Sequence, residues 1–172
     1  MTTMKGPSID RRITWDEENR VTKTLDRRDE TLYAYDDGGI RAIKRGKYGE
    51  TLYAGENLSI RNGTIESKHI FAGNARVVTK VANKGKDAGT NYYHGDHLGS
   101  SNSITTKAGA VHENLEYFPY GETWVHNLLA KAESLPFKFT SKEYDPETGW
   151  YYFGARYFDA VLSKWASADK FP

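Results

Sequence analysis

The stretch of sequence that decides the fold runs from Thr31 to Ala54 and reads TLYAYDDGGIRAIKRGKYGETLYA. It opens and closes on the same four residues, Thr-Leu-Tyr-Ala, twenty positions apart. The turn-forming run Asp37-Gly38-Gly39 lies between them, and the flanking Thr, Tyr and Ile residues favour strands. A period near twenty residues fits one β-hairpin per repeat, and such a hairpin must stack on neighbours to bury a face. The stretch therefore predicts consecutive antiparallel hairpins.

Further turn signals extend this pattern along the chain. Asn62-Gly63 is a preferred type I′ hairpin dipeptide, and the β-formers beside it predict a hairpin over residues 56–70. Residues 124–134 contain good helix formers and precede Pro136, so this segment is the one place where a short helix is expected. We therefore predict an all-β chain of consecutive hairpins with at most one short helix near 124–134.

The composition excludes several classes of function. The 24 basic and 23 acidic residues nearly cancel, so no nucleic-acid-binding surface is expected. The absence of cysteine excludes disulfides, thiolate nucleophiles and zinc–thiolate sites. No stretch approaches the roughly 18 apolar residues of a membrane span, and the first residues lack the apolar core of a signal peptide. No cofactor is expected.

Several motifs resemble those of RHS/YD-repeat proteins. Residues 33–44 resemble the Tyr-Asp-x-x-Gly-x-Arg repeat unit, with Tyr35, Asp36, Gly39 and Arg41 at the defining positions. Residues 15–21 look like a degenerate copy in which Trp15 replaces the tyrosine and Asn19 takes the glycine position, where it tolerates a positive φ. The second half resembles the RHS repeat-associated core domain in five ordered segments: residues 92–100 with His94, Asp96, His97 and Gly99; 117–122 with Pro119 and Gly121; 139–149 with Asp145 and Gly149; 150–159 with Arg156 and Asp159; and 163–169.

The resemblance implies an architecture and a role. RHS proteins wind a ribbon of hairpins into a hollow shell that holds a C-terminal toxin, and the core domain forms the last section of that shell. The implied division is an N-terminal tail (1–12), degenerate YD repeats (13–82), a linker (83–91) and a core domain (92–172). The implied location is secreted or at the cell surface. The implied partners are a larger RHS polypeptide or further copies joined through sheet edges, with toxin cargo or carbohydrate as other ligands.

The resemblance also implies an aspartate-dependent self-cleavage site, which is incomplete in this sequence. Asp169 aligns with the first aspartate of the pair, and the chain stops before the second motif. Such chemistry requires two carboxylates that share a proton, one acting as base and the other as acid. We therefore expect a structural protein without catalytic residues, not an enzyme.

Two alternatives from other classes of function remain open in the sequence. His94, Asp96 and His97 could hold a metal ion and make the chain a small hydrolase. Alternatively, the Tyr-Asp pairs could display rings that stack on sugars, as in a glycan- or receptor-binding module. In a structural segment, by contrast, rings pack between hairpins, Asp96 caps backbone N–H groups, and few tyrosines are exposed.

Arg156 gives a specific test of the structural interpretation. It lies in the aromatic run from Trp150 to Asp159, whose rings occupy both faces of any strand. A strand that is apolar on both faces is typically buried on both sides. We therefore expect the Arg156 guanidinium to lie in the core beside aromatic rings, paired with Asp145 or Asp159.

Overall fold

The computed structural model describes residues 1–5, 10–129 and 132–168. Its strands are β1 (Thr2–Lys5), β2 (Asp10–Trp15), β3 (Val21–Asp26), β4 (Asp29–Tyr35), β5 (Arg41–Gly46), β6 (Gly49–Ala54), β7 (Leu58–Arg61), β8 (Ile65–Ala72), β9 (Ala75–Asn83), β10 (Lys86–Gly95), β11 (Ser101–Thr106), β12 (Val111–Tyr117), β13 (Thr123–Leu128), β14 (Glu143–Asp145), β15 (Trp150–Tyr152), β16 (Tyr157–Asp159) and β17 (Lys164–Trp165). The helical segment in this part of the chain is the 3-10 turn η1 (Phe139–Ser141). The all-β prediction is confirmed.

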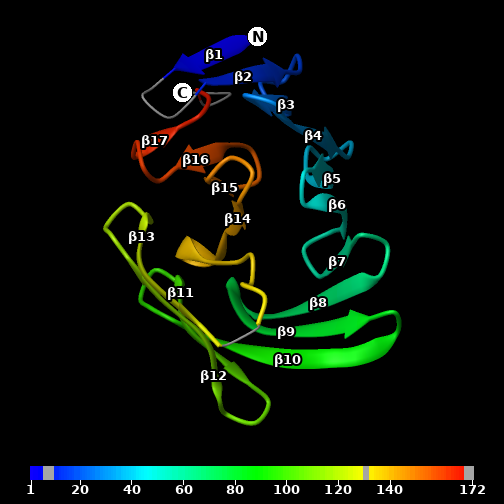
Figure 1. The fold of residues 1–172 in the computed structure, drawn as a ribbon, viewed down its shortest axis with the longest axis vertical. Coiled ribbons are helices and arrows are strands. Elements are labelled where there is room, and N and C mark those ends of the chain that lie inside the picture. The colour runs from blue at the N-terminus through cyan, green and yellow to red at the C-terminus, as the bar shows by residue number, and fades with distance from the viewer. Residues whose placement is uncertain (6–9, 130–131, 169–172) are drawn as a thin grey trace.

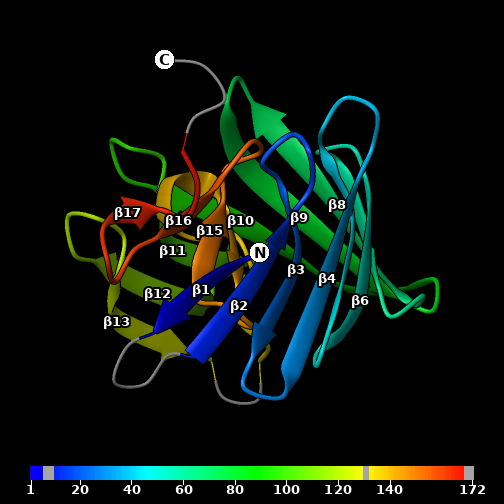
Figure 2. The same cartoon turned by 90° about the horizontal axis from the view of Figure 1, so that it is seen from above.

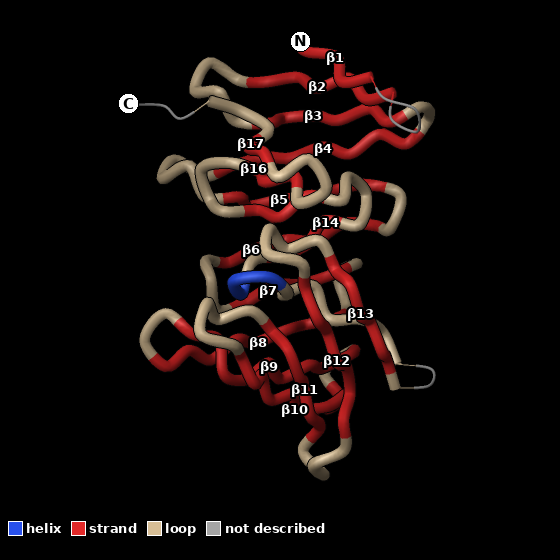
Figure 3. The backbone as a smooth tube through the Cα atoms, turned by 90° about the vertical axis from the view of Figure 1, so that its left-hand side faces the viewer, coloured by secondary structure: helices blue, strands red, loops and turns tan. Residues whose placement is uncertain are grey.

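The strands form two sheets of very different size. β1 to β13 make one thirteen-stranded sheet in strict sequence order, and β14 to β17 make a four-stranded sheet, also in sequence order. We call these the strip and the inner sheet. The strip descends from β1 and curls back at β10 to β13, as Figures 1 and 3 show, and the inner sheet rises through the space it partly encircles (Figures 1 and 2).

The predicted hairpin at 56–70 is confirmed. β7 and β8 pair antiparallel, with Arg61 opposite Ile65. Asn62 and Gly63 in the connecting turn both have positive φ, 52° and 67°. The Asn-Gly dipeptide therefore supplies the backbone geometry that the turn requires.

The segment 124–134, the one place where the sequence allows a short helix, begins instead as a strand, and no α-helix forms among its described residues. Residues 123–128 form β13, which pairs with β12 along Glu113 to Tyr117. Helix propensity is a weak preference, and the neighbouring β12 offers a full ladder of backbone hydrogen bonds that overrides it. Residues 130 and 131 of the same segment lie outside the described residues.

The segments expected as the tail and the linker contain paired strands. Within the predicted tail, residues 2–5 form β1 and pair with β2. The predicted linker 83–91 contains a hairpin turn at Lys84-Gly85, and β10 then pairs with β9 from Lys86 onward. The strip is thus continuous from the repeat region into the core region. The division into repeats and core stays a prediction that rests on sequence motifs.

One five-residue turn recurs between strands of the strip. In the turn that begins at Asp36, the Asp36 N–H donates to the Ile40 carbonyl, the Gly39 N–H donates to the Asp36 carbonyl, and Gly39 has a φ of 78°. The same pair of backbone bonds closes the turns that begin at Asp16, Asp96, Thr106 and Phe118. Asn19 takes the glycine position with a φ of 58°, as the degenerate repeat predicted.

A β-bulge follows this turn and decides which side chains point inward. Tyr35 pairs with Arg41 but Ala34 pairs with Ile43, so Ala42 is an extra residue. A bulge of this kind breaks the alternation of faces. Residues three apart therefore share the inner side: Arg41 and Lys44 are both buried on β5, as are Ser101 and Ile104 on β11.

The tyrosine of the Tyr-Asp pair joins successive hairpins. The Tyr35 hydroxyl donates to the Val21 carbonyl at 2.7 Å, and the Tyr117 hydroxyl donates to the Ser101 carbonyl at 3.0 Å. Each acceptor is the first residue of the strand that follows an earlier Asp turn. The phenol thus satisfies a backbone carbonyl near the turn while its ring fills the space between neighbouring hairpins.

The apolar core is small and lies between the two sheets. One buried cluster contains Ile13, Val21 and Tyr33 from the strip with Trp150 and Tyr157 from the inner sheet. A second contains Tyr93, Ile104 and Phe137. Many of the other inward positions on the strip are polar or charged, among them Thr24, Thr31, Arg41, Lys44, Thr79, Asn91 and Glu113. Polar pairing therefore contributes to the contact between the strip and the inner sheet, through Arg41 and Lys44.

Candidate functional site

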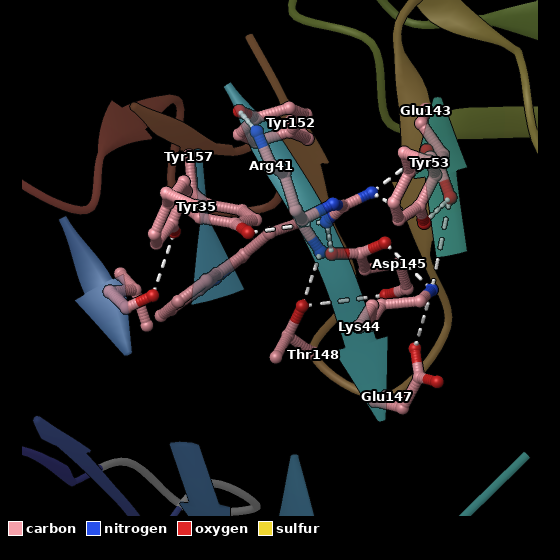
Figure 4. Close-up of polar contacts among 12 residues, drawn as sticks. Tyr35, Arg41, Lys44, Tyr53, Glu143, Asp145, Glu147, Thr148, Tyr152 and Tyr157 are labelled. Carbon is pink, nitrogen blue, oxygen red and sulfur yellow. Dashed lines mark hydrogen bonds and ion pairs between the residues drawn. The ribbon is translucent and has the colours of Figure 1, made fainter. Parts of the chain in front are cut away.

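A cluster of buried charges joins the strip to the inner sheet. The bulge in β5 turns Arg41 and Lys44 inward, and β14 brings Glu143 and Asp145 to meet them, since residues two apart on a strand share a face. Glu147 follows in the turn between β14 and β15. We call these five residues the seam. Figure 4 shows the two cations of the strip facing the three carboxylates.

The side chains of the seam lie at short ion-pair distances and are almost completely buried. Arg41 and Asp145 are 1% and 0% exposed, and their side chains meet at 2.6 Å. The other Arg41 terminal nitrogen lies 2.8 Å from Glu143. Lys44 lies 2.9 Å from Asp145 and 3.3 Å from Glu147. Every charge of the seam therefore has an opposite charge within ion-pair distance.

Four tyrosine rings enclose the Arg41 guanidinium. Its terminal nitrogens donate to the hydroxyls of Tyr53 at 3.0 Å and Tyr157 at 3.2 Å. Its central carbon lies 4.3 Å from the ring centroid of Tyr152, whose hydroxyl accepts from the Arg41 backbone N–H. Tyr33 is the fourth ring, with its centroid at 5.9 Å. Guanidinium stacks on aromatic faces better than ammonium does, so this surrounding specifies arginine.

The pKa shifts follow from the pairing. Burial by itself would raise the pKa of Asp145, but Arg41 and Lys44 outweigh it and hold this pKa below the ordinary value. Burial would lower the pKa of Arg41 and of Lys44, and the carboxylates of Asp145 and Glu143 outweigh it and raise both. All three groups are therefore charged at neutral pH. Removal of one would leave buried charges unpaired.

The role of the seam is structural, because its ion pairs hold the strip against the inner sheet. Its carboxylates are paired with the terminal nitrogens of Arg41 and with Lys44, and the partners lie about a hundred residues apart in sequence. A paired cluster of this kind specifies which hairpin of the strip faces β14. It brings together Arg41 and Asp145, which the motifs had identified separately. The Tyr35 hydroxyl, by contrast, bonds to Val21 within the strip.

The remaining repeat and core residues lie in turns. Asp36 accepts from the Ile40 N–H, and Asp96 accepts from the N–H groups of Leu98 and Ser100, each at 2.8 Å. Asp96 is thus occupied as a turn cap. The glycines of these turns and of the β14–β15 turn have positive φ: Gly39, Gly99, Gly121 and Gly149.

The structure does not bring His94, Asp96 and His97 together as metal ligands. His94 is exposed and contacts the Thr105 hydroxyl at 3.0 Å, and His97 is exposed in the turn. Among the described residues, no group of three or more histidine, aspartate or glutamate side chains has a geometry that could hold a metal ion. The arrangement therefore gives no support to the metal-hydrolase alternative.

The other motif residues act locally. Asp159 accepts from the Trp150 indole N–H and from the Leu162 N–H, each at 3.0 Å. The Gly121 carbonyl accepts from the Tyr151 hydroxyl, which fastens the β12–β13 turn to the inner sheet. Pro119 is exposed in that turn. Asp169, the aspartate matched to the self-cleavage motif, lies outside the described residues.

The prediction that Arg156 lies in the core is wrong. Arg156 is half-buried, and its guanidinium carbon lies 4.1 Å from the ring centroid of Trp165, so the aromatic contact exists at the surface of the inner sheet. Asp145, one of its expected partners, pairs with Arg41 and Lys44. Arg156 lies in a turn before β16, which removes it from the doubly buried strand that the aromatic run suggested.

Sequence reasoning missed Lys44, Glu143 and Glu147. A signal existed for Glu143, because it lies two residues before Asp145 and shares its face if the segment is a strand. Lys44 carried no comparable signal, since a spacing of three residues from Arg41 implies opposite faces unless a bulge intervenes.

Ring exposure separates the structural and glycan-binding hypotheses. Three of the twelve tyrosines are exposed, Tyr48, Tyr92 and Tyr120, and they lie on separate elements. The other nine are buried or half-buried. A row of displayed rings, which the binding hypothesis requires, is therefore not formed by the tyrosines.

Comparisons with known proteins agree with this architecture. No protein-family model matches the chain. The toxin subunit YenC1 of Yersinia entomophaga is 34% identical over 80 residues, which cover 45% of this chain and 8% of YenC1. The tRNA nuclease WapA of Bacillus subtilis is 22% identical over 169 residues, covering 92% of this chain and 7% of WapA. The chain thus spans less than a tenth of these relatives.

Solved structures share the fold over nearly the whole chain. The crystal structure of TcdB2-TccC3 matches with a TM-score of 0.78 at 22% identity, covering 92% of this chain and 9% of that one. The Photorhabdus luminescens Tc holotoxin pore matches with the same TM-score and coverage.

These findings define the class of fold: a curled strip of consecutive hairpins closed by an inner sheet, as in the Tc toxin structures. The resemblance to RHS/YD-repeat proteins predicted from the sequence is confirmed, with Tc toxin components and WapA as relatives. No helix in the described part of the chain is both long enough and apolar enough to cross a membrane.

Proposed function

We propose that this chain is a structural segment of an RHS-type shell that encapsulates and delivers a C-terminal toxin. The observation that carries the proposal is the seam, which fixes the inner sheet against the concave side of the strip through Arg41 and Asp145. A shell wall needs this closure, because a curved strip of hairpins alone would leave inner apolar residues such as Ile13, Val21 and Tyr33 exposed to water.

The proposed role requires no catalysis by this chain. The described motif residues are engaged in turns and packing. We do not propose for this chain the nuclease activity named for WapA, because this chain covers 7% of that protein. We also propose a secreted or cell-surface location and association with a larger RHS polypeptide, which would supply the rest of the wall.

A protection experiment tests this function. The 172-residue chain, with an unfolded reporter peptide fused after Pro172, is co-expressed with a longer RHS polypeptide that ends before the core motifs. We expect a stable complex in which proteinase K spares the reporter. The Arg41→Ala variant opens the seam and should expose the reporter, whereas Arg45→Ala, which removes an exposed arginine of the same strand, should not. Equal digestion of the reporter with and without the longer polypeptide would refute encapsulation.

A further inference from the structure

A cavity of about 610 Å³ lies beside the seam, between the strip and the inner sheet. On the strip side it is bounded by residues 55–59, β8 and the β8–β9 turn. On the inner side it is bounded by residues 137–143 and 152–154. No contact described so far assigns a role to it, and the proposed shell function does not depend on it.

Arg76 lines this cavity and has unused hydrogen-bond donors. The residue is 7% exposed, and its Nε and Nη1 atoms are buried without a hydrogen-bond partner in the described structure. Its guanidinium carbon lies 3.3 Å from the ring centroid of Phe137 and 4.7 Å from that of Phe71. These cation–π contacts supply no hydrogen-bond acceptor of the N or O type for Nε and Nη1. Buried donors without partners are rare in folded proteins, because each costs free energy.

The charges around the cavity leave a small positive excess. Its wall carries the cations Arg41, Arg76 and Lys142 and the carboxylates Glu56 and Glu143. Arg41 and Glu143 neutralise each other at 2.8 Å. Burial, reinforced by the charge of Arg76, lowers the pKa of the neighbouring His69 to about 3, so this imidazole is neutral. Burial also lowers the pKa of Arg76 to about 10, which shows that the surrounding acidic groups compensate its desolvation only in part.

We propose that this cavity binds a carboxylate, with the Arg76 guanidinium as its principal donor. The planar fork of arginine matches the two oxygens of a carboxylate. Asn74 and the second amide N–H of Asn57, whose first is donated to the His69 carbonyl, add neutral donors on the wall. The rings of Phe137 and Phe153 give the rest of the ligand an apolar surface. A single excess cation favours a monoanion, because a phosphate dianion would be repelled by Glu56. The carboxylate comes either from a small free acid or from an acidic side chain of a peptide.

A titration with two probes tests the proposal and separates these sources. The full chain is titrated with sodium acetate and with the amidated peptide acetyl-Gly-Asp-Gly, followed by the NMR signals of arginine Nε–H groups. We expect saturable binding of at least one probe with a dissociation constant on the order of 1 mM. Tighter binding of the peptide identifies a peptide side chain as the source, and tighter binding of acetate identifies a small acid. The asparagine counterpart of the peptide should not bind.

Variants decide whether Arg76 is the donor. Arg76→Met keeps the apolar stem and should weaken binding at least about tenfold, while Lys80→Met removes an exposed charge from the same strand and should leave binding unchanged. If Arg76→Met does not fold, Arg76→Lys replaces it, and a loss of the Nε–H shift with weaker binding is expected. Absence of saturation with both probes, equal binding by the folded Arg76 variant, or equally tight binding of inorganic phosphate would overturn the proposal.

Discussion

Arg41 and Arg156 show what decides the role of an arginine in an aromatic-rich motif. Arg41 is buried and pairs with Glu143 and Asp145, whereas Arg156 stacks on Trp165 at the surface of the inner sheet. The sequence identifies both as motif residues. Their environments depend on the bulge at Ala42 and on a turn before β16, and neither feature has a clear signature in side-chain chemistry.

Replacement of Arg41 tests the seam. Arg41→Ala leaves Asp145 and Glu143 buried with one cation fewer, so we expect a loss of about 3–5 kcal/mol in the free energy of unfolding. Arg156→Ala should cost about 1 kcal/mol, the size of an exposed cation–π contact. Arg45→Ala, which removes an exposed ion pair with Glu50, should cost less than about 1 kcal/mol. Urea unfolding of the three variants measures these differences, and equal midpoints for Arg41→Ala and Arg45→Ala would contradict the seam.

His69 should make stability depend on mild acid. Its folded pKa is lowered from 6.5 to about 3 because it is buried and faces Arg76, so the unfolded chain binds the proton first as the pH falls. The stabilisation is complete above pH 6.5 and is lost progressively between pH 6.5 and pH 3. The Thr79 and Ser59 hydroxyls that contact the ring carry no charge.

A variant isolates this contribution. His69→Gln should flatten the dependence of unfolding free energy on pH between 6.5 and 4, whereas His97→Gln, at an exposed position, should leave the slope as it is. The measurement is urea unfolding at a series of pH values. A slope that is the same in His69→Gln and in the parent chain would show that another group binds the proton.

At the scale of elements, the recurrent turn explains the Tyr-Asp-x-x-Gly pattern. The aspartate caps backbone N–H groups, the glycine or Asn19 adopts a positive φ, and the tyrosine bonds to a neighbouring hairpin. The sequence predicted these turns because each requirement selects a residue type. It failed at residues 123–128, where pairing with β12 and not local propensity sets the conformation.

Adjacent aspartates in one turn provide a matched test. Asp36 accepts a hydrogen bond from the Ile40 N–H at 2.8 Å, and Asp37 beside it is exposed. Asp36→Ala should lower the free energy of unfolding by about 1 kcal/mol, the usual value of one such bond. Asp37→Ala removes the same charge and should have almost no effect. Thermal unfolding of both variants under identical conditions provides the comparison, and equal melting temperatures would contradict the capping role.

At the scale of the whole molecule, the strip has two terminal strands. β1 and β13 each pair with one strand on one side in the described structure. Near β13, the rings of Phe118 and Trp124 lie 5.9 Å apart and are 47% and 66% exposed. Exposed strand edges and apolar patches favour association with further strands.

We therefore expect the chain to self-associate through the β13 edge. Trp124→Glu places a charge on that edge and should shift the sedimentation distribution towards the monomer. Tyr48→Glu introduces the same charge at an exposed ring between β5 and β6 and should leave the distribution unchanged. Purely monomeric sedimentation of the parent chain over a wide concentration range would contradict this expectation.

The sequential order of the strip has a consequence for how such chains change in length during evolution. Each strand pairs only with the strands before and after it, so the gain or loss of a whole hairpin leaves the other pairings in register. The constraint lies in the interval of 104 positions from Arg41 to Asp145, because that interval must bring the chain back to β5. The same holds for β2 to β4, whose Ile13, Val21 and Tyr33 pack against Trp150 and Tyr157. Duplication and deletion should therefore accumulate on the N-terminal side of β2, while the interval from β2 to Asp145 keeps its length.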